Sequence, residues 1–178
     1  MDKDQRKLFV AVGVCLMSVQ LAERALQESI DTVFDDETVR LSEQSEPERK
    51  QTLGDFVKKL KKRAKLPYHI RERFFDFIKM RNQFVHEFDF DFQTEKGREQ
   101  AEAFLIKLSS LATAIALLLT AILQASAKDE YGVDFSEGEA DENRRILKAL
   151  ENQFGPLARE ILAGRNKVLA RSKMGTRS

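Results

Sequence analysis

Three side chains that together can act on a phosphodiester lie within one short stretch of the sequence. Arg81 and Asn82 are adjacent, and His86 follows the asparagine by four positions. A histidine titrates near neutral pH and can move protons, whereas the planar fork of an arginine can grip a phosphate. The asparagine can orient either the imidazole or the phosphate. We therefore predict that Arg81, Asn82 and His86 are the catalytic residues.

RNA cleavage without a metal ion sets the demands that these residues must meet. The ribose 2′-hydroxyl loses a proton and attacks the neighbouring phosphorus, the leaving 5′-oxygen gains a proton, and negative charge builds on the phosphoryl oxygens. A histidine can move the protons, and an arginine, which stays protonated, can hold the charge. One histidine per chain supplies only one of the two groups, an acid and a base, that this reaction needs. We therefore expect a homodimer in which His86 and Arg81 of both subunits meet in one cleft.

The three residues must be positioned by a helix, which we expect at about Tyr68–Phe88. Each residue turns a helix by about 100°, so Asn82 and His86 lie almost above one another, with Arg81 beside them. After this helix, phenylalanines and acids alternate up to Phe92, which we interpret as a frayed helix end and a turn because no partner strand is predicted. No histidine or cysteine stands at ligand spacing from these acids, so we predict neither a metal site nor a cofactor.

Three further helices are expected around this one. Apolar residues recur at three- and four-residue spacings over about Asp4–Thr32 and Glu48–Leu66, and the stretch of about Thr94–Ala127 is apolar on most of its surface. A helix this apolar must be covered by more than one neighbour. We therefore predict an all-α fold, an antiparallel helical bundle of four main helices spanning residues 1–127. The excess of apolar surface is a second reason to expect a homodimer.

The remaining residues, 128–178, are predicted to form a linker and a C-terminal helical arm. The linker is acidic and contains glycine. Two shorter helices are expected beyond it, Asp141–Phe154 and Leu157–Ala170, separated at Gly155-Pro156 because proline interrupts a helix. The arm would dock on a partner subunit or on nucleic acid, or remain a mobile tail.

The helix predicted at Glu48–Leu66 is strongly basic outside its apolar positions. The chain as a whole has a net charge of only +1, so this asymmetry is local. A run of lysines and arginines can track the phosphates of RNA, although such a run also serves as a solvated face. We predict that it binds RNA through Lys58, Lys59, Lys61, Lys62, Arg63 and Lys65.

The sequence predicts a cytoplasmic protein that does not insert into a membrane. The charged N-terminus is unlike a signal peptide, and the single Cys15 cannot form an internal disulfide. The stretch Leu108–Ala127 lacks charged residues and is long enough to span a bilayer. However, serine, threonine and glutamine are scattered through it, and no aromatic belt flanks it. A helix buried on several sides explains the stretch better than a membrane-associated protein does.

The stretch Arg81-Asn82-Gln83-Phe84-Val85-His86 resembles the R-x4-H signature of HEPN domains, in the form with asparagine after the arginine. The order of the predicted helices over residues 1–127 is also similar to that family. HEPN domains are compact helical bundles, often dimeric, and many are metal-independent endoribonucleases of toxin–antitoxin, phage-defence and CRISPR systems. The resemblance implies that Arg81 and His86 are catalytic with support from Asn82. It also implies that RNA is the substrate and that an antitoxin or other regulatory protein is a partner.

One residue departs from the pattern of HEPN toxins that pair with a nucleotidyltransferase antitoxin. Those toxins often carry a tyrosine two positions after the histidine, where it is modified, whereas this chain has Phe88. Inactivation by nucleotidylation at this position is therefore excluded. A second arginine–asparagine pair, Arg165-Asn166, has Ala170 where a histidine would be needed, so the dipeptide alone predicts no site.

Besides a ribonuclease, the sequence is compatible with a non-catalytic helical module that binds RNA or a protein. In that alternative, Asn82 and His86 form a buried polar network that fixes the bundle. The position of His86 separates the two interpretations, because a catalytic histidine lines an open cleft and a structural one is sealed in the core.

Overall fold

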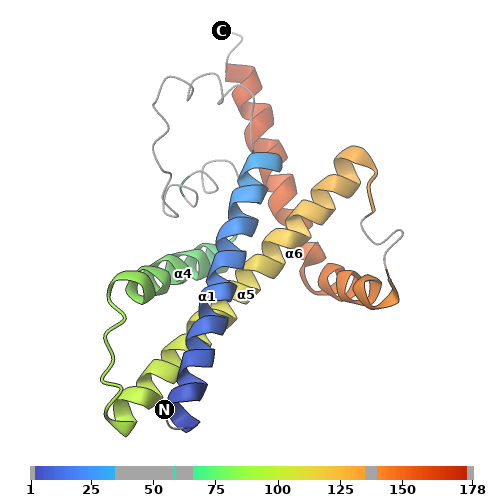
Figure 1. Ribbon diagram of the computed structural model, residues 1–178. Helices are drawn as coiled ribbons and strands as arrows, with labels where there is room; N and C mark the ends of the chain where they lie inside the picture. Colours follow the sequence, from blue (N-terminus) through green and yellow to red (C-terminus); the bar gives the residue numbers. More distant parts are fainter. Residues whose placement is uncertain (1–2, 35–57, 59–65, 135–139, 176–178) are drawn as a thin grey trace.

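The chain is all-α in a computed structural model that describes residues 3–34, 58, 66–134 and 140–175. Four helices lie in these ranges and no strand does (Figure 1). The predicted all-α class and the helices predicted at 4–32, 68–88 and 94–127 are confirmed, with small differences at their ends. The observed helices are α1 (Lys3–Thr32), α4 (Tyr68–His86), α5 (Glu95–Tyr131) and α6 (Asp141–Gly175).

The core is centred on α1 and α5, which make the most extensive contact among the four described helices. The buried residues of α1 recur at three- and four-residue intervals and therefore lie on one side of the helix. α5 supplies the facing leucine, isoleucine and alanine side chains between Leu105 and Ile122. Burial raises the pKa of the Cys15 thiol to about 11, so this thiol is neutral at physiological pH and packs as a small apolar residue. The buried residues of α1 include Cys15, Val19, Ala22, Leu26 and Ile30.

α1 and α5 run in the same direction, which differs from the antiparallel arrangement expected from the sequence. The hydroxyl oxygens of Ser18 and Ser109 lie 2.9 Å apart near the middle of the contact. At one end, Arg165 contacts both Val33, just after α1, and Glu130, near the end of α5. The two helices therefore match start to start and end to end, as Figure 1 also shows. The antiparallel prediction was wrong for this pair because apolar spacing fixes which face of a helix is buried but not the direction of its neighbour.

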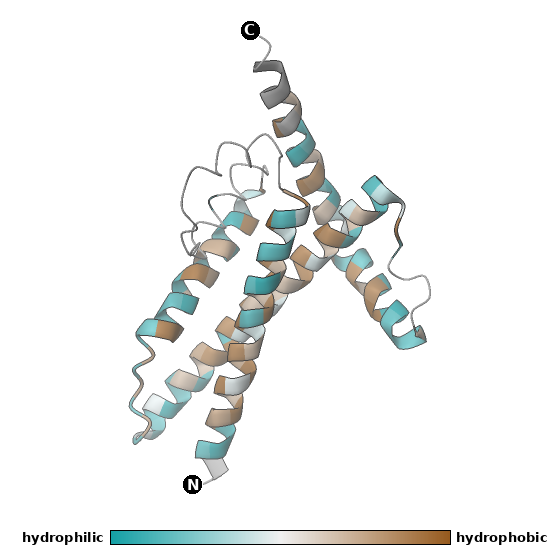
Figure 2. Ribbon diagram, turned by 45° about the horizontal axis from the view of Figure 1, so that its top comes forward, coloured by the Kyte–Doolittle hydropathy of each residue, from teal (hydrophilic) through white to brown (hydrophobic). Residues whose placement is uncertain are grey.

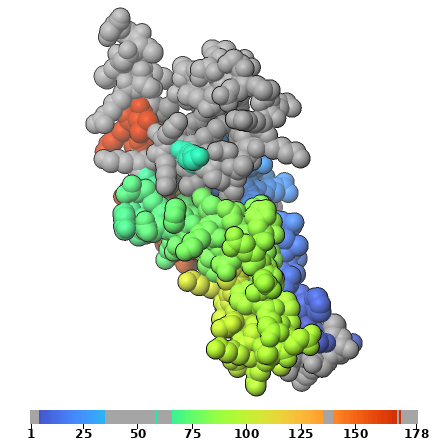
Figure 3. Space-filling model, turned by 90° about the vertical axis from the view of Figure 1, so that its left-hand side faces the viewer, coloured from blue at the N-terminus to red at the C-terminus, as the bar shows by residue number. Residues whose placement is uncertain are grey.

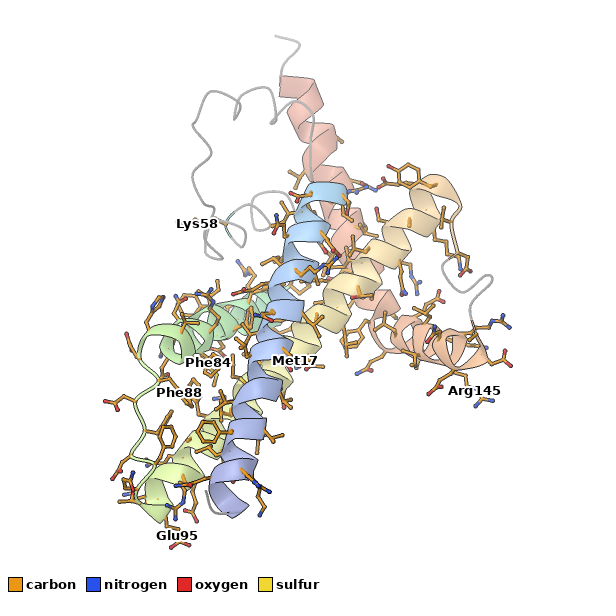
Figure 4. All side chains as sticks on the ribbon, viewed as in Figure 1. Met17, Lys58, Phe84, Phe88, Glu95 and Arg145 are labelled. Atoms are coloured by element: carbon orange, nitrogen blue, oxygen red, sulfur yellow. The ribbon has the colours of Figure 1, made fainter. Side chains whose placement is uncertain are left out.

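α4 packs against α5 and is joined to it by the short segment 87–94 (Figure 1). Phe74 and Phe77 are fully buried, together with Ile70 one turn earlier. Phe88, in the joining segment, contacts Phe104 of α5 with ring centroids 5.9 Å apart. Figure 4 shows Phe84 and Phe88 in the space between the joining segment and α5. This segment has no strand, so the predicted helix end and turn are confirmed.

The start of α5 is fixed by a cap and a close backbone approach. The Thr94 hydroxyl oxygen accepts a hydrogen bond from the Gly97 amide at 3.2 Å, which satisfies one of the free donors at the helix N-terminus. A Cβ atom on Gly97 would lie 2.0 Å from the Asp91 carbonyl oxygen, so only glycine fits there. These contacts hold the segment that follows His86 against the first turn of α5.

α6 is one continuous helix, so the two separate helices predicted for the C-terminal arm were wrong. Pro156 lies inside it, and Figure 1 shows that the helix changes direction part-way along its length. A proline removes one hydrogen bond and clashes with the preceding turn, which bends a helix without necessarily ending it. Packing holds the two halves together here, because Leu150 before the proline and Ile161 after it are both buried in the common core.

The expected linker is also shorter than predicted. α5 continues to Tyr131, and Gly132 ends it with a φ of 67°, a left-handed conformation that favours glycine. The described part of the linker is therefore only 132–134 and 140. The division of the chain into 1–127 and 128–178 stays a prediction.

Among the described residues, two helices are long and apolar enough to cross a membrane when judged by length and composition alone. They span Gln5–Thr32 and Glu95–Tyr131. In the most apolar window of each helix, 22% of the first and 44% of the second is buried. Figure 2 shows hydrophobic residues repeated along both helices. We define the outer face of α1 as a set of exposed apolar residues on the helix, each more than half exposed. The set comprises Phe9, Val10, Val14, Met17 and Leu21. The expected cytoplasmic location and absence of membrane insertion stay predictions.

Candidate active site

Arg81 is held at the surface between α4 and α1 by two side chains. Its Nε donates a hydrogen bond to Oε1 of Glu23 on α1 at 2.7 Å, and its Nη1 donates to Oδ1 of Asn82 at 3.3 Å. The Arg81 side chain is 26% exposed and that of Glu23 is 31% exposed. A charged pair that is partly shielded from water restrains the guanidinium more firmly than an exposed pair would. Arg81 is therefore a positioned cation with part of its fork open to solvent.

His86 is the last residue of α4, and its side chain is exposed. The backbone amide of Glu87 donates to the Gln83 carbonyl at 2.8 Å and closes the final turn beside it. Within the part of the chain that the structure describes, no hydrogen bond or ion pair involves the imidazole. Asn82, one turn earlier, is exposed as well. The buried polar network considered for Asn82 and His86 is therefore absent, and both side chains are accessible to a ligand.

The helix geometry separates Arg81 from His86. Five residues at about 100° each place the two Cβ directions roughly 140° apart around α4, whereas Asn82 lies only about 40° from His86. Arg81 leans toward α1 and Glu23, and His86 faces solvent. The structure thus brings Arg81 and Asn82 together, and it shows no contact between His86 and either of them.

Glu23 is the part of this site that the sequence did not reveal. It stands beside the buried Ala22 in α1, at the edge of the apolar side of the helix. An acidic residue at such an edge is typical of a partner for a neighbouring helix. However, 58 positions separate it from Arg81, and only the folded structure, in which the two side chains form an ion pair, identifies the partner.

The predicted RNA-binding residues fall almost entirely outside the described residues. Lys58 is described and exposed, and Figure 4 shows it on the same side of the molecule as α4. Figure 3 views this side and shows α4 at the surface. The other five lie outside the described ranges, so their part in RNA binding stays a prediction; they are Lys59, Lys61, Lys62, Arg63 and Lys65.

Other features of the described residues lie away from Arg81 and His86. A cavity of about 360 Å³ lies between α5 and α6, with Lys128, Lys148 and Arg159 in its wall. No group of three or more histidine, cysteine or acidic side chains in the described ranges is arranged to hold a metal ion.

Comparison with protein-family models, curated proteins and solved structures finds no match to this chain. The resemblance to HEPN domains therefore rests on the Arg81–His86 motif and the helix order, and it stays a prediction.

Proposed function

We propose that the chain is a metal-independent endoribonuclease of the HEPN type, acting as a toxin or defence effector. The observation that carries this proposal is the exposure of His86 on the same helix as a guanidinium fixed by Glu23. An accessible imidazole and a restrained arginine supply proton transfer and charge stabilisation, which are the two needs of metal-free phosphodiester cleavage.

In the proposed reaction, the imidazole of His86 takes the proton of the ribose 2′-hydroxyl as that oxygen attacks phosphorus. The phosphorus–5′-oxygen bond breaks, a protonated imidazole supplies the leaving oxygen with its proton, and a 2′,3′-cyclic phosphate forms. Arg81 holds the phosphoryl oxygens, whose charge rises during the attack. Asn82 steadies the guanidinium through its amide oxygen.

Two subunits are part of the proposal because one chain meets these needs poorly. A single chain carries one histidine at the site, and the separation of about 140° between Arg81 and His86 makes simultaneous contact with one phosphate difficult. A twofold axis near the exposed side of α4 would set His86 of one subunit opposite Arg81 of the other. One imidazole would then act as the base and the second as the acid.

A non-catalytic module that binds RNA or protein is the second candidate. The ion pair between Arg81 and Glu23 favours it, because an arginine engaged by a carboxylate has less charge to offer a phosphate. In this candidate the pair fastens α4 to α1, and His86 is one exposed polar residue among many.

Cleavage of a fluorescently labelled RNA in the presence of EDTA tests the proposal. His86→Ala and Arg81→Ala should each lower the cleavage rate by about 10²–10⁴-fold, the range expected for loss of a proton-transfer group or a charge-stabilising group. Both variants should keep the sedimentation coefficient of the parent dimer. His86→Ala should keep its melting temperature as well, because the side chain is exposed.

His69→Ala is the matched control, because it removes the other histidine, which is also exposed on α4. It should leave cleavage unchanged. Equal rates for the parent and both active-site variants would refute the ribonuclease proposal and leave the binding module.

A further inference from the structure

The exposed side of α4 carries a row of side chains that ends at His86. Their spacings alternate between four and three residues, so they follow one face of the helix. Every member of the row is exposed. We call this row the α4 strip, and it comprises Tyr68, Glu72, Phe75, Lys79, Asn82 and His86.

Two of these exposed residues are aromatic. Tyr68 is 68% exposed and Phe75 is 59% exposed, although the same helix buries Phe74 and Phe77 completely. The guanidinium carbon of Arg71 lies 5.6 Å from the centroid of the Tyr68 ring, which is a cation–π distance. Exposed rings next to cations are the features on which single-stranded nucleic acids stack their bases.

Cations lie beside both rings of the strip. Arg71 stands between Tyr68 and Phe75 in the sequence and Lys79 lies one turn beyond Phe75, and the acids Glu72 and Asp76 are exposed on the same helix. The outer face of α1 offers a contrast, since its exposed residues are all apolar and no cation is interleaved among Val10, Val14, Met17 and Leu21. An apolar face suits a protein or lipid surface, whereas rings alternating with cations suit a nucleic acid.

We infer that the α4 strip binds single-stranded RNA and leads it to His86, with bases stacked on Tyr68 and Phe75 and phosphates near Arg71 and Lys79. This inference rests on the proposed ribonuclease function. Double-stranded RNA does not fit, because its bases are stacked on one another and closed to the rings. The strip is about 27 Å long at 1.5 Å per residue, which corresponds to roughly eight stacked nucleotides at 3.4 Å each.

Fluorescence anisotropy with a labelled 12-nucleotide single-stranded RNA tests the inference, with the His86→Ala protein as the parent so that the probe is not cut. Tyr68→Ala and Phe75→Ala in that parent should each raise the dissociation constant about 5- to 150-fold, the equivalent of losing one stacked base. The same RNA annealed to its complement should bind the parent more weakly than the single strand and respond little to either change.

Phe9→Ala in the same parent is the matched control, because Phe9 is 67% exposed on α1. Its removal should leave the dissociation constant unchanged. The binding measurement does not depend on cleavage, so it separates failure of the strip from failure of the ribonuclease proposal.

Three results would overturn the inference: no binding of the single strand by the parent, unchanged affinity in both strip variants, or an equal loss in Phe9→Ala. A fourth is dissociation of the dimer by Phe75→Ala in sedimentation equilibrium, which would make the strip a contact between subunits. Circular dichroism of each variant confirms that the helices are retained.

Discussion

The chain contains the dipeptide Arg-Asn twice, and the two copies make similar contacts but differ in exposure. Arg81-Asn82 lies on α4 and Arg165-Asn166 on α6. In both, the guanidinium donates to the amide oxygen of the asparagine that follows it. In both, the guanidinium also pairs with a glutamate from another helix, Glu23 for Arg81 and Glu130 for Arg165.

The two arginines differ in how much of the guanidinium remains accessible to a ligand. Arg165 is only 12% exposed, and it also donates to the Val33 carbonyl at 2.8 Å, so it ties α6 to the ends of α1 and α5. Arg81 is 26% exposed, and His86 follows it by five positions where Ala170 follows Arg165. The dipeptide therefore builds a local clamp in both places, and only exposure and the nearby histidine make the Arg81 copy a candidate for chemistry.

The largest expected effect separates the two arginines by activity. Arg81→Lys keeps the positive charge and loses the planar fork, so RNA cleavage should fall by about 10²–10³-fold. Arg165→Lys, the matched change at the less exposed copy, should retain the cleavage rate of the parent per folded molecule. Initial rates at saturating RNA, corrected for the folded fraction, test this prediction, and a comparable loss in both variants would contradict it.

The next effect separates the two arginines by stability. Arg165→Ala removes hydrogen bonds to a carboxylate and a backbone carbonyl, so the free energy of unfolding should fall by about 2–4 kcal/mol. Arg24→Ala breaks an exposed pair with Glu28 on α1 and should cost about 0.5 kcal/mol or less. Urea unfolding followed by circular dichroism measures both, and equal losses would remove the distinction between a clamp and a surface pair.

Glu23 should have an intermediate effect through the position of Arg81. Glu23→Gln retains an acceptor for the Arg81 Nε and removes the negative charge, so the guanidinium is held less firmly. Cleavage should fall by about 3- to 10-fold, while the free energy of unfolding changes by about 1 kcal/mol or less. The loss should appear in kcat rather than in KM. A faster variant would show instead that the carboxylate restrains Arg81 from its substrate.

The smallest expected effect comes from completing the motif at the second pair. Ala170→His, made in the His86→Ala protein, places a histidine five positions after Arg165. Because Arg165 is engaged by Val33 and Glu130, this variant should recover no cleavage. An exposed substitution of this kind should change the free energy of unfolding by less than about 0.5 kcal/mol. Recovery of cleavage would mean that the local sequence motif is sufficient without its surroundings.

Much of the fold follows from local pattern. The apolar spacing of α1 predicted one buried stripe, because a period near 3.6 residues fixes one face of a helix. Five of its members are buried, namely Cys15, Val19, Ala22, Leu26 and Ile30, and Leu8, Ala11 and Val12 are partly buried, whereas Leu16 is 44% exposed. The all-α class and three of the helix ranges followed from the same pattern. The direction of α1 relative to α5 did not, because either direction buries the same face.

The error at α6 and the failure to predict Glu23 have a common physical origin. The local preference of proline predicts that the helix ends at Pro156. Burial of Leu150 and Ile161 in one core nevertheless keeps both halves helical. In the same way, Arg81 and His86 were found from their types and spacing, whereas the carboxylate that holds Arg81 comes from a distant part of the chain. Contacts between distant helices decide both outcomes, and they leave no local signal.

The hydrogen bond from Arg165 to Val33 also affects the order in which tertiary contacts can form during synthesis. It joins residues 132 positions apart, and α6 follows the other described helices in the chain. Synthesis proceeds from the N-terminus, so α1 and α5 leave the ribosome before Arg165, which ties their ends together. During that interval the ends of α1 and α5 lack the contacts that Arg165 makes with both. The ends of α1 and α5 are therefore joined only after translation has passed α6.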